Sequence, residues 1–277
     1  MPAIKTRTVP SLDKALCILE LLARSRAGLT LPDLVDQSGL AKSSAHYLLV
    51  TLERRGYVHR NERAGRYQLG VKLFSLANSA LSGLGLRQKS APHLAALRIK
   101  TGLTVHFAIF EQNEAVLISK HDGQSGPRLA TWVGKRMELH CTGLGKALIA
   151  FLPAAEIDTI IQSHGLGRHN ENTISSPKRF REELERVVRM GYALDDEEDE
   201  LGMRCIGAPV FGRNRRPVAA VSIAGTTSEI VPENVAYLVA ELKRTAARIG
   251  MAAADAFSSV LEEMPLDDEE ALHRAVS

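Results

Sequence analysis

The segment from Leu29 to Leu69 contains two helical patterns joined by a glycine turn, and a basic hairpin follows them. Thr30 is expected to be the N-cap of a first helix over residues 31–37. Gly39 supplies the positive φ that a sharp turn requires, and the next helix is expected over residues 41–55. This order of elements is typical of a winged helix-turn-helix.

The second of these helices has two faces of different chemistry. Its core-facing residues recur at helical spacing: Ala45, Leu48, Leu49 and Leu52. The opposite face and its flanks carry the polar residues Lys42, Ser43, Ser44, His46 and Tyr47. A helix that reads the major groove of DNA presents such side chains near its N-terminal half. A solvated helix in a domain that binds no DNA would show the same pattern, so the helix alone leaves both interpretations open.

The hairpin combines strand-like runs at residues 57–60 and 66–69. Three arginines lie at or beside its tip: Arg60, Arg63 and Arg66. They suit contact with DNA phosphates, although a plain surface hairpin would also carry solvated charges. The polar helix and the basic hairpin occur together in one contiguous segment, which is much less expected by chance than either element alone. Together they predict a unit that binds double-stranded operator DNA.

The chain has 277 residues, which exceeds the usual size of one compact domain. Its 45% hydrophobic and 24% charged residues are typical of a globular protein. The longest apolar runs are too short to cross a bilayer, and the N-terminus lacks an apolar signal core, so we expect a cytoplasmic protein without membrane contact. Residues 1–70 hold eleven Lys and Arg against six Asp and Glu, so the basic excess lies where the DNA-binding pattern lies.

The three cysteines, Cys17, Cys141 and Cys205, are far apart in the sequence and form no CxxC pair or zinc-type His/Cys spacing. We therefore expect free thiols, no metal and no cofactor. His140 beside Cys141 raises the alternative of a nucleophile and its base, but adjacent residues on a strand point apart. GxSxG, HExxH and complete GxGxxG motifs are also absent from the sequence, so we predict that the protein is not an enzyme.

Periodicity predicts further helices on both sides of this segment. A first helix starts at a cap formed by Ser11 to Asp13 and closes near Gly28. After the hairpin, residues 71–84 carry a broad apolar face on a helix. This face packs either on the second domain of the same chain or on another subunit, and Gly83 and Gly85 mark a break behind it.

The remainder of the chain predicts a mixed domain in which one sheet is packed against helices. Helices are expected over residues 92–100, 146–151, 177–189 and 232–254. Strands are expected over residues 105–110, 115–120, 128–133, 205–211 and 218–224. The acidic segment near the C-terminus is expected to be a loosely held tail.

Two segments of this domain carry candidate binding chemistry. Residues 140–147 place a glycine-bearing loop directly before a helix, where free amides favour an anion, although glycines that merely allow close packing would look the same. Residues 195–200 form the run DDEEDE, for which a solvated loop is the usual explanation. A hard-metal site and a single inward-pointing carboxylate are the alternatives, and a continuous run does not favour the metal site.

The sequence resembles the IclR family of bacterial transcriptional regulators. The resemblance extends over about residues 10–255 and rests on the segments LTLPDLVDQSGLAKSSAHYLLVTLERRGYV, GRYQLGVKLFSLA, LHCTGLGKALIAFLP, GYALDDEEDELGMRCIGAPVF and VAAVSIAG in this order. It implies an α+β fold with a winged helix-turn-helix domain over residues 8–70, a linking helix over 71–89 that helps to dimerise, and a GAF-like effector domain over 90–256. Residues 257–277 form the expected tail.

The same resemblance implies an effector pocket. The positions that match its lining are the backbones of Gly143 and Leu144 and the side chains of Asp195, Met203, Cys205 and Ser222. Ala224 departs from members that carry a serine there, which removes one polar contact with the effector. The resemblance favours a homodimer or a dimer of dimers.

Electrostatics restrict the effector. A buried Asp195 beside a bound carboxylate repels it unless the effector offers a hydroxyl or a proton to that oxygen. The expected effector is therefore a hydroxy acid or a phenolic acid, with its carboxylate on the Gly143 and Leu144 amides and its hydroxyl on Asp195. A small-molecule sensor that acts only through protein contacts is the alternative function, and it would lack salt-dependent binding to duplex DNA.

Overall fold

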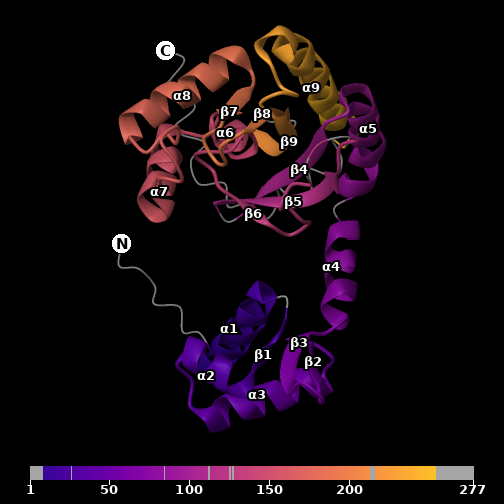
Figure 1. The fold of residues 1–277 in the computed structure, drawn as a ribbon, viewed down its shortest axis with the longest axis vertical. Coiled ribbons are helices and arrows are strands. Elements are labelled where there is room, and N and C mark those ends of the chain that lie inside the picture. Colours follow the sequence, from indigo (N-terminus) through magenta and orange to yellow (C-terminus); the bar gives the residue numbers. More distant parts are fainter. Residues whose placement is uncertain are drawn as a thin grey trace, which may run out of the picture. The chain divides into compact units, whose positions relative to one another are not determined.

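The computed structural model describes residues 9–25, 27–83, 85–111, 113–124, 126, 128–212 and 216–253. The chain divides into two compact units, Met1–Ala80 and Leu81–Ser277 (Figure 1). The expected tail over residues 257–277 lies outside the described residues. No helix within the described part of the chain is long and apolar enough to cross a membrane.

Up to the end of the hairpin, the described residues of the first unit form three helices and a three-stranded antiparallel sheet. The helices are α1 (Pro10–Arg24), α2 (Leu31–Ser38) and α3 (Lys42–Arg54). The strands are β1 (Leu29–Thr30), β2 (Val58–Asn61) and β3 (Arg66–Leu69), in the order β1-β3-β2. The core of this unit includes Ile18, Leu22, Leu34, Leu49 and Tyr67. The sequence predicted these three helices and the hairpin, whereas β1 was not expected.

Local side-chain chemistry sets the helix boundaries in this unit. Thr30 forms a capping box with Asp33, in which each side chain accepts a hydrogen bond from the other residue's amide, at 3.3 and 2.8 Å. Gly39 ends α2 with a φ of 67°, as expected. α1 differs from the expectation because its N-cap is Val9. Pro10 opens the helix, where the missing N–H costs nothing, so the predicted cap residues lie inside the first turn.

Two helices follow the hairpin, namely α4 (Lys72–Gly83) and α5 (Leu86–Thr101). Gly85 has a φ of 57° and is the N-cap of α5, so a break separates the two helices as expected. The predicted start of the next helix at residue 92 is wrong, because α5 begins six residues earlier and continues through Pro92. A proline inside a helix removes one backbone hydrogen bond. In α5, the buried side chains of Leu86, Leu94 and Leu97 on both sides of this proline hold the helix together.

The second unit contains one six-stranded antiparallel sheet in the order β6-β5-β4-β9-β8-β7. Its strands are β4 (Thr104–Glu111), β5 (Glu114–His121), β6 (Arg136–Met137), β7 (Ala193–Asp196), β8 (Met203–Phe211) and β9 (Pro217–Thr226). The strand expected over residues 128–133 is wrong, because the described residues of this segment are irregular and the exposed side chains of Trp132 and Val133 bury no alternating face.

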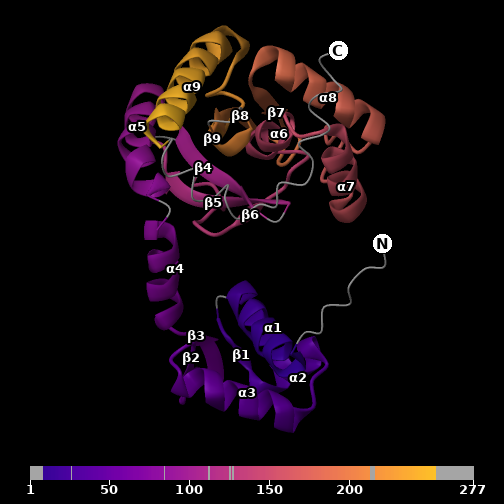
Figure 2. The ribbon, with the colours of Figure 1, turned by 180° about the vertical axis from the view of Figure 1, so that it is seen from behind.

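Helices cover both faces of this sheet (Figures 1 and 2). α5 and α9 (Pro232–Ala252) pack on one face over Phe107, Val221 and Ile223. The other face is covered by α6 (Gly143–Ile149), α7 (Ala154–His164) and α8 (Pro177–Met190). α6 begins three residues before its expected start, because Thr142 is its N-cap and accepts a hydrogen bond from the Gly145 amide at 2.9 Å.

Candidate functional site

The outer face of α3 is exposed in the first unit. Lys42, Ser43 and His46 are exposed, Ser44 is half-buried, and Tyr47 has 72% of its surface exposed. The opposite face packs into the core, with Ala45 and Leu49 fully buried and Leu48 and Leu52 partly buried. The predicted division of this helix into a core face and a polar face is therefore confirmed.

The three arginines of the hairpin have different surroundings. Arg63 is exposed in the turn, whose backbone is held by Asn61 Oδ1, an acceptor from the amides of Arg63 and Ala64 at 3.1 Å. Arg60 is also exposed, and its guanidinium lies 5.5 Å from the centre of the Tyr67 ring. Arg66, the third arginine, makes further contacts within its own unit.

Arg66 is half-buried. Its Nη1 donates to the carbonyl of Gly28 at 2.8 Å and lies 4.0 Å from Asp33 Oδ2, while 42% of its side chain stays exposed. These contacts connect β3 to the start of α2. Arg66 therefore stabilises the wing within its own unit, while Arg60 and Arg63 are exposed. DNA contact by each of the three arginines stays a prediction.

The second unit contains a cavity of about 80 Å³ on the face of the sheet that α6 covers. The register of the strands explains which side chains reach it. Asp195, Cys205 and Ala224 are directly opposite one another on β7, β8 and β9, and Ser222 is opposite His106 on β4. Since side chains at alternate positions share a face, these five residues form two neighbouring rows on the cavity side.

Five of the six residues expected in the effector pocket line this cavity: Leu144, Asp195, Met203, Cys205 and Ser222. Gly143 is not among the lining residues. A Cβ atom at Gly143 would lie 2.8 Å from the carbonyl oxygen of Cys205, so this glycine allows α6 to pack closely on β8. Close packing therefore explains why position 143 is a glycine, and a contact between its amide and the effector stays a prediction.

The carboxyl group of Asp195 is buried at the edge of the cavity. Its Oδ1 accepts hydrogen bonds from the amides of Glu198 at 2.9 Å and Asp199 at 3.4 Å. Burial raises the pKa of Asp195 to about 7, although the Glu198 amide and the Lys146 charge oppose the shift. The solvated-loop interpretation of the acidic run is wrong at two positions, because Asp195 and Glu198 are both buried.

His106 and Ser222 lie next to each other in the cavity. Burial and the nearby Lys120 charge lower the pKa of His106 to about 4, so its ring is neutral near pH 7, and Nε2 lies 2.8 Å from Thr131 Oγ1. Ser222 Oγ is fully buried and has no nitrogen or oxygen partner among the described residues. The Cys205 thiol is its polar neighbour and a weak one.

Sequence reasoning missed His106, Thr131 and Asp199, which also line the cavity. His106 lies in an apolar strand, where a lone histidine gives no signal of a binding role. Thr131 belongs to the segment that was expected to be a strand. Asp199 is one of six consecutive acids, and only the fold distinguishes it from its neighbours.

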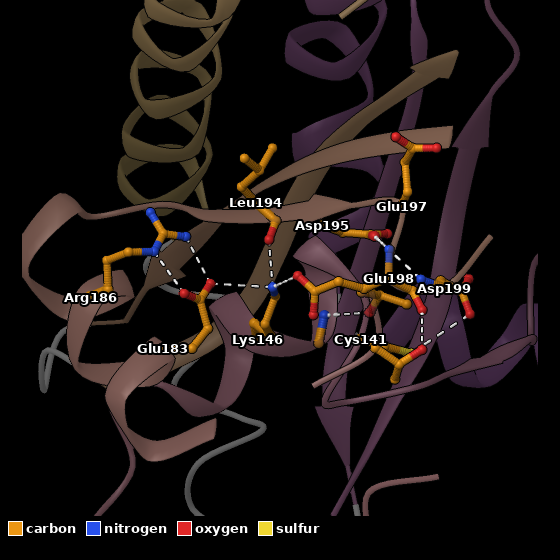
Figure 3. Close-up of polar contacts among 12 residues, drawn as sticks. Cys141, Lys146, Glu183, Arg186, Leu194, Asp195, Glu197, Glu198 and Asp199 are labelled. Carbon is orange, nitrogen blue, oxygen red and sulfur yellow. Dashed lines mark hydrogen bonds and ion pairs between the residues drawn. The ribbon is translucent and has the colours of Figure 1, made fainter. Parts of the chain in front are cut away.

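Behind the cavity, Lys146 is fully buried in α6 (Figure 3). Its Nζ donates to Glu198 Oε1 and to the Leu194 carbonyl, both at 2.5 Å, and to Glu183 Oε1 at 3.2 Å. Arg186 forms two hydrogen bonds with the same Glu183 carboxylate, each at 2.7 Å. Although burial alone would raise the pKa of Glu183, the Arg186 hydrogen bonds and the Lys146 charge hold it below its usual value.

His140 and Cys141 lie in a turn before α6, so the argument that adjacent residues point apart on a strand does not apply to them. The Cys141 thiol donates to Asp199 Oδ1 at 3.7 Å (Figure 3). Burial, with the charges of Asp199 and Asp195, raises the pKa of this thiol above its usual value. A thiol held neutral in this way is a poor nucleophile.

Comparison with known proteins connects these two units to one family. Residues 11–62 match the IclR helix-turn-helix domain, and residues 78–251 match the bacterial transcriptional regulator IclR C-terminal domain. The HTH-type transcriptional regulator XynR of Escherichia coli is 33% identical over 85% of this chain and 94% of its own length. The transcriptional repressor IclR of E. coli is 32% identical over 89% of this chain and 91% of its own length.

A solved structure agrees with this assignment. The Thermotoga maritima IclR crystal structure is 30% identical, with a TM-score of 0.72, over 88% of this chain and 99% of that one. The relatives are named as transcriptional regulators, and the match to the IclR helix-turn-helix domain favours a DNA-binding regulator over a sensor that acts through protein contacts alone. The chain therefore belongs to the IclR family of bacterial transcriptional regulators, with an N-terminal DNA-binding helix-turn-helix domain and a C-terminal α/β effector domain.

Proposed function

We propose that the effector is a small organic acid with a hydroxyl group, bound in the cavity of the second unit. The observation that carries this proposal is Ser222 Oγ, which is fully buried, faces the cavity and has no nitrogen or oxygen partner among the described residues. A buried hydroxyl without a partner is costly, so a ligand hydroxyl or carboxylate there regains a hydrogen bond.

The charges around the cavity favour a ligand that combines an acid with a hydroxyl. Asp195 lies across β8 from the Ser222 strand, and its pKa of about 7 allows it to accept a ligand hydroxyl when ionised or to coexist with an anion when protonated. The Leu144 amide, in the first turn of α6, is the donor that we assign to the ligand carboxylate. Ala224 offers no hydroxyl at its position, so Ser222 carries this role alone in its strand.

Calorimetric titration with matched pairs of acids tests the effector class, for example benzoate against 4-hydroxybenzoate and propionate against lactate. We expect at least one hydroxy acid to bind more tightly than its partner that lacks the hydroxyl. Ser222→Ala should weaken that binding by about fivefold or more. The ligand group that Ser222 would bond is then left unpaired in the cavity, and an unpaired buried polar group costs about 1–3 kcal/mol. The exposed Ser163, replaced by alanine, is the matched control.

Two results would contradict this effector class. Binding that is equal for both members of every pair shows that the hydroxyl is not recognised. An effector affinity that is unchanged in Ser222→Ala shows that the Ser222 hydroxyl does not contact the ligand, and the proposal rests on this contact. Neither result affects the family assignment.

We further propose that operator DNA is contacted by residues of α3 and of the wing: Lys42, Ser43, Ser44, His46 and Tyr47 on α3, and Arg60, Arg63 and Arg66 in the wing. A homodimer or a dimer of dimers would place two such units on the half-sites of one operator. The effector alters operator affinity only if it binds one arrangement of the units more tightly than another. The linking helix α4, which contains the boundary between the two compact units, is the element that we assign to this coupling.

A further inference from the structure

Three metal-ligating side chains come together behind the effector cavity, at the turn before α6. They belong to His140, Cys141 and His169, and one ligand atom of each lies within 4.8 Å of those of the other two. None of these residues lines the cavity. The sequence showed no such site, because 27 residues separate Cys141 from His169.

The backbone around His169 is fixed by hydrogen bonds. Thr173 Oγ1 accepts from the amides of His169 at 3.1 Å and Asn170 at 3.0 Å, and it donates to the Glu198 carbonyl at 2.7 Å. Asn170 Nδ2 donates to the same carbonyl at 3.2 Å. The segment that carries His169 is therefore attached to the acidic turn after β7, although the His169 side chain itself is exposed.

The surroundings of His140 fix its tautomer. Nε2 lies 2.7 Å from the carbonyl oxygen of Gly167, and a carbonyl only accepts, so Nε2 carries the proton of the neutral ring. The other nitrogen keeps its lone pair. A histidine that donates one ring N–H to a backbone carbonyl while the second nitrogen stays free is the usual arrangement in metal sites. The ring is also packed edge-on against Phe180, with centroids 6.4 Å apart.

We propose that His140, Cys141 and His169 bind a zinc ion. Two imidazoles and one thiolate are a preferred ligand set for Zn²⁺, which takes four ligands in a tetrahedron. Bond lengths of about 2.0–2.3 Å place tetrahedral ligand atoms about 3.3–3.8 Å apart. The ligand atoms of the three residues lie within 4.8 Å of one another, so zinc binding requires them to approach by at most about 1.5 Å. Binding removes the thiol proton of Cys141 to solvent.

Two carboxylates add negative charge around this cluster. Asp199 Oδ1 lies 3.7 Å from Cys141 Sγ, and Glu138 Oε2 lies 3.6 Å from His140 Nδ1. Asp199 accepts the hydrogen bond of the thiol and also lines the effector cavity, so it connects the proposed metal site to that cavity. The fourth position of the zinc ion is filled by this carboxylate or by a water molecule, for which the exposed side of His169 leaves access.

Cobalt substitution tests the site in the full-length, tag-free chain. Co²⁺ added to metal-free protein should produce intense visible bands typical of four-coordinate cobalt and a thiolate-to-cobalt charge-transfer band in the near ultraviolet. One equivalent of Zn²⁺ per chain should abolish both. Cys141→Ser should lose the charge-transfer band, and His169→Ala should weaken zinc binding at least about tenfold.

Matched controls separate the site from adventitious binding. Cys17→Ser removes a cysteine of α1, and His164→Ala removes an exposed histidine five residues from His169; both should bind cobalt as the unaltered chain does. Cys141 is buried, so the cobalt spectrum of its variant is interpreted only if the circular dichroism spectrum shows that the variant is folded. His169 is exposed, so its variant should fold as the unaltered chain does. Absence of the thiolate band, or equal zinc affinity of the chain and its His169→Ala variant, overturns the proposal.

Discussion

Asp195 has 5% of its surface exposed, and this burial changes its acid–base chemistry. Its pKa rises from 3.8 to about 7 in the folded protein. Between these two values the folded state holds a proton that the unfolded state has lost. The contribution of Asp195 to the free energy of unfolding is therefore greatest below the lower pKa. It falls as the pH rises and is lost above about pH 7, where the folded protein must carry a buried charge.

Asp195→Asn should remove this dependence. The variant should have a higher free energy of unfolding than the unaltered chain above pH 7, by on the order of 1–4 kcal/mol, because one pKa unit corresponds to about 1.4 kcal/mol. Asn can still accept from the Glu198 and Asp199 amides. Urea denaturation across the acidic and neutral range measures the effect, and Glu182→Gln, at an exposed position, is the control. Parallel pH profiles for the chain and Asp195→Asn would refute this assignment.

At the scale of elements, Lys146 connects α6 to α8 and to the turn after β7. Its ammonium group contacts Glu183 on α8 and Glu198 in the turn, and Glu198 Oε2 has no further partner among the described residues. Burial raises the pKa of Glu198, although the Lys146 charge opposes this shift. Lys146 is thus one of the groups that hold the acidic turn at the cavity, together with Thr173 and the Asp195 carboxylate.

Lys146→Met should destabilise the second unit by about 3–5 kcal/mol, because removal of one partner leaves buried charge uncompensated. Chemical denaturation measures the loss. Addition of Glu198→Gln to this variant should recover part of it, since the buried carboxylate is then neutral. Lys178→Met, an exposed lysine of α8, should have little effect. If the double variant is no more stable than Lys146→Met, the loss does not come from unpaired charge on Glu198.

The wing and α3 should contribute different properties to DNA binding. Arg63→Ala should weaken binding to all duplexes and reduce the slope of log affinity against log salt by about one, if this exposed arginine contacts phosphate as we propose. Tyr47→Ala should instead change the preference among sequences. Fluorescence anisotropy with specific and nonspecific duplexes at several salt concentrations separates the two effects. Equal losses of affinity on every duplex for Tyr47→Ala would count against its contact with bases. Arg179→Ala, at an exposed position of the second unit, is the control.

At the scale of the whole molecule, α4 and the residue before it carry apolar side chains that the single chain leaves exposed. Val71 has 81% and Phe74 has 69% of its surface exposed. Leu84, which the sequence placed on the same face, lies outside the described residues. Exposed apolar side chains on a linking helix are typical of a subunit contact, which supports the proposed dimer.

Phe74→Glu should therefore convert the oligomer to monomer at micromolar concentration, as measured by sedimentation velocity. Because two units on one operator bind far more tightly than one, the variant should also lose affinity for a two-half-site operator and keep its affinity for a single half-site. Ser79→Glu, at an exposed position of the same helix, is the control. An unchanged sedimentation coefficient for Phe74→Glu would place the contact elsewhere.

Local signals in the sequence predicted most elements correctly. The Thr30 capping box, the αL glycine at position 39 and the hairpin all depend on residues within a few positions of one another. The same holds for α8 and for the β8–β9 pair. Failures occurred where long-range packing opposed a local signal. Pro92 indicated a helix start but lies inside α5, and the apolar residues before Trp132 indicated a strand but are irregular.

The sequence by itself determined the helix-turn-helix, the polar face of α3 and the family, because these depend on periodicity, caps and the order of motifs along the chain. Only the tertiary structure decided which acids of the 195–200 run are buried, since Asp195 and Glu198 are held by backbone amides and by Lys146 from another element. The structure also decided that Arg66 braces the wing and that His140, Cys141 and His169 share one site. Burial and electrostatic pairing depend on neighbours in space, and a sequence read along its length does not contain those neighbours.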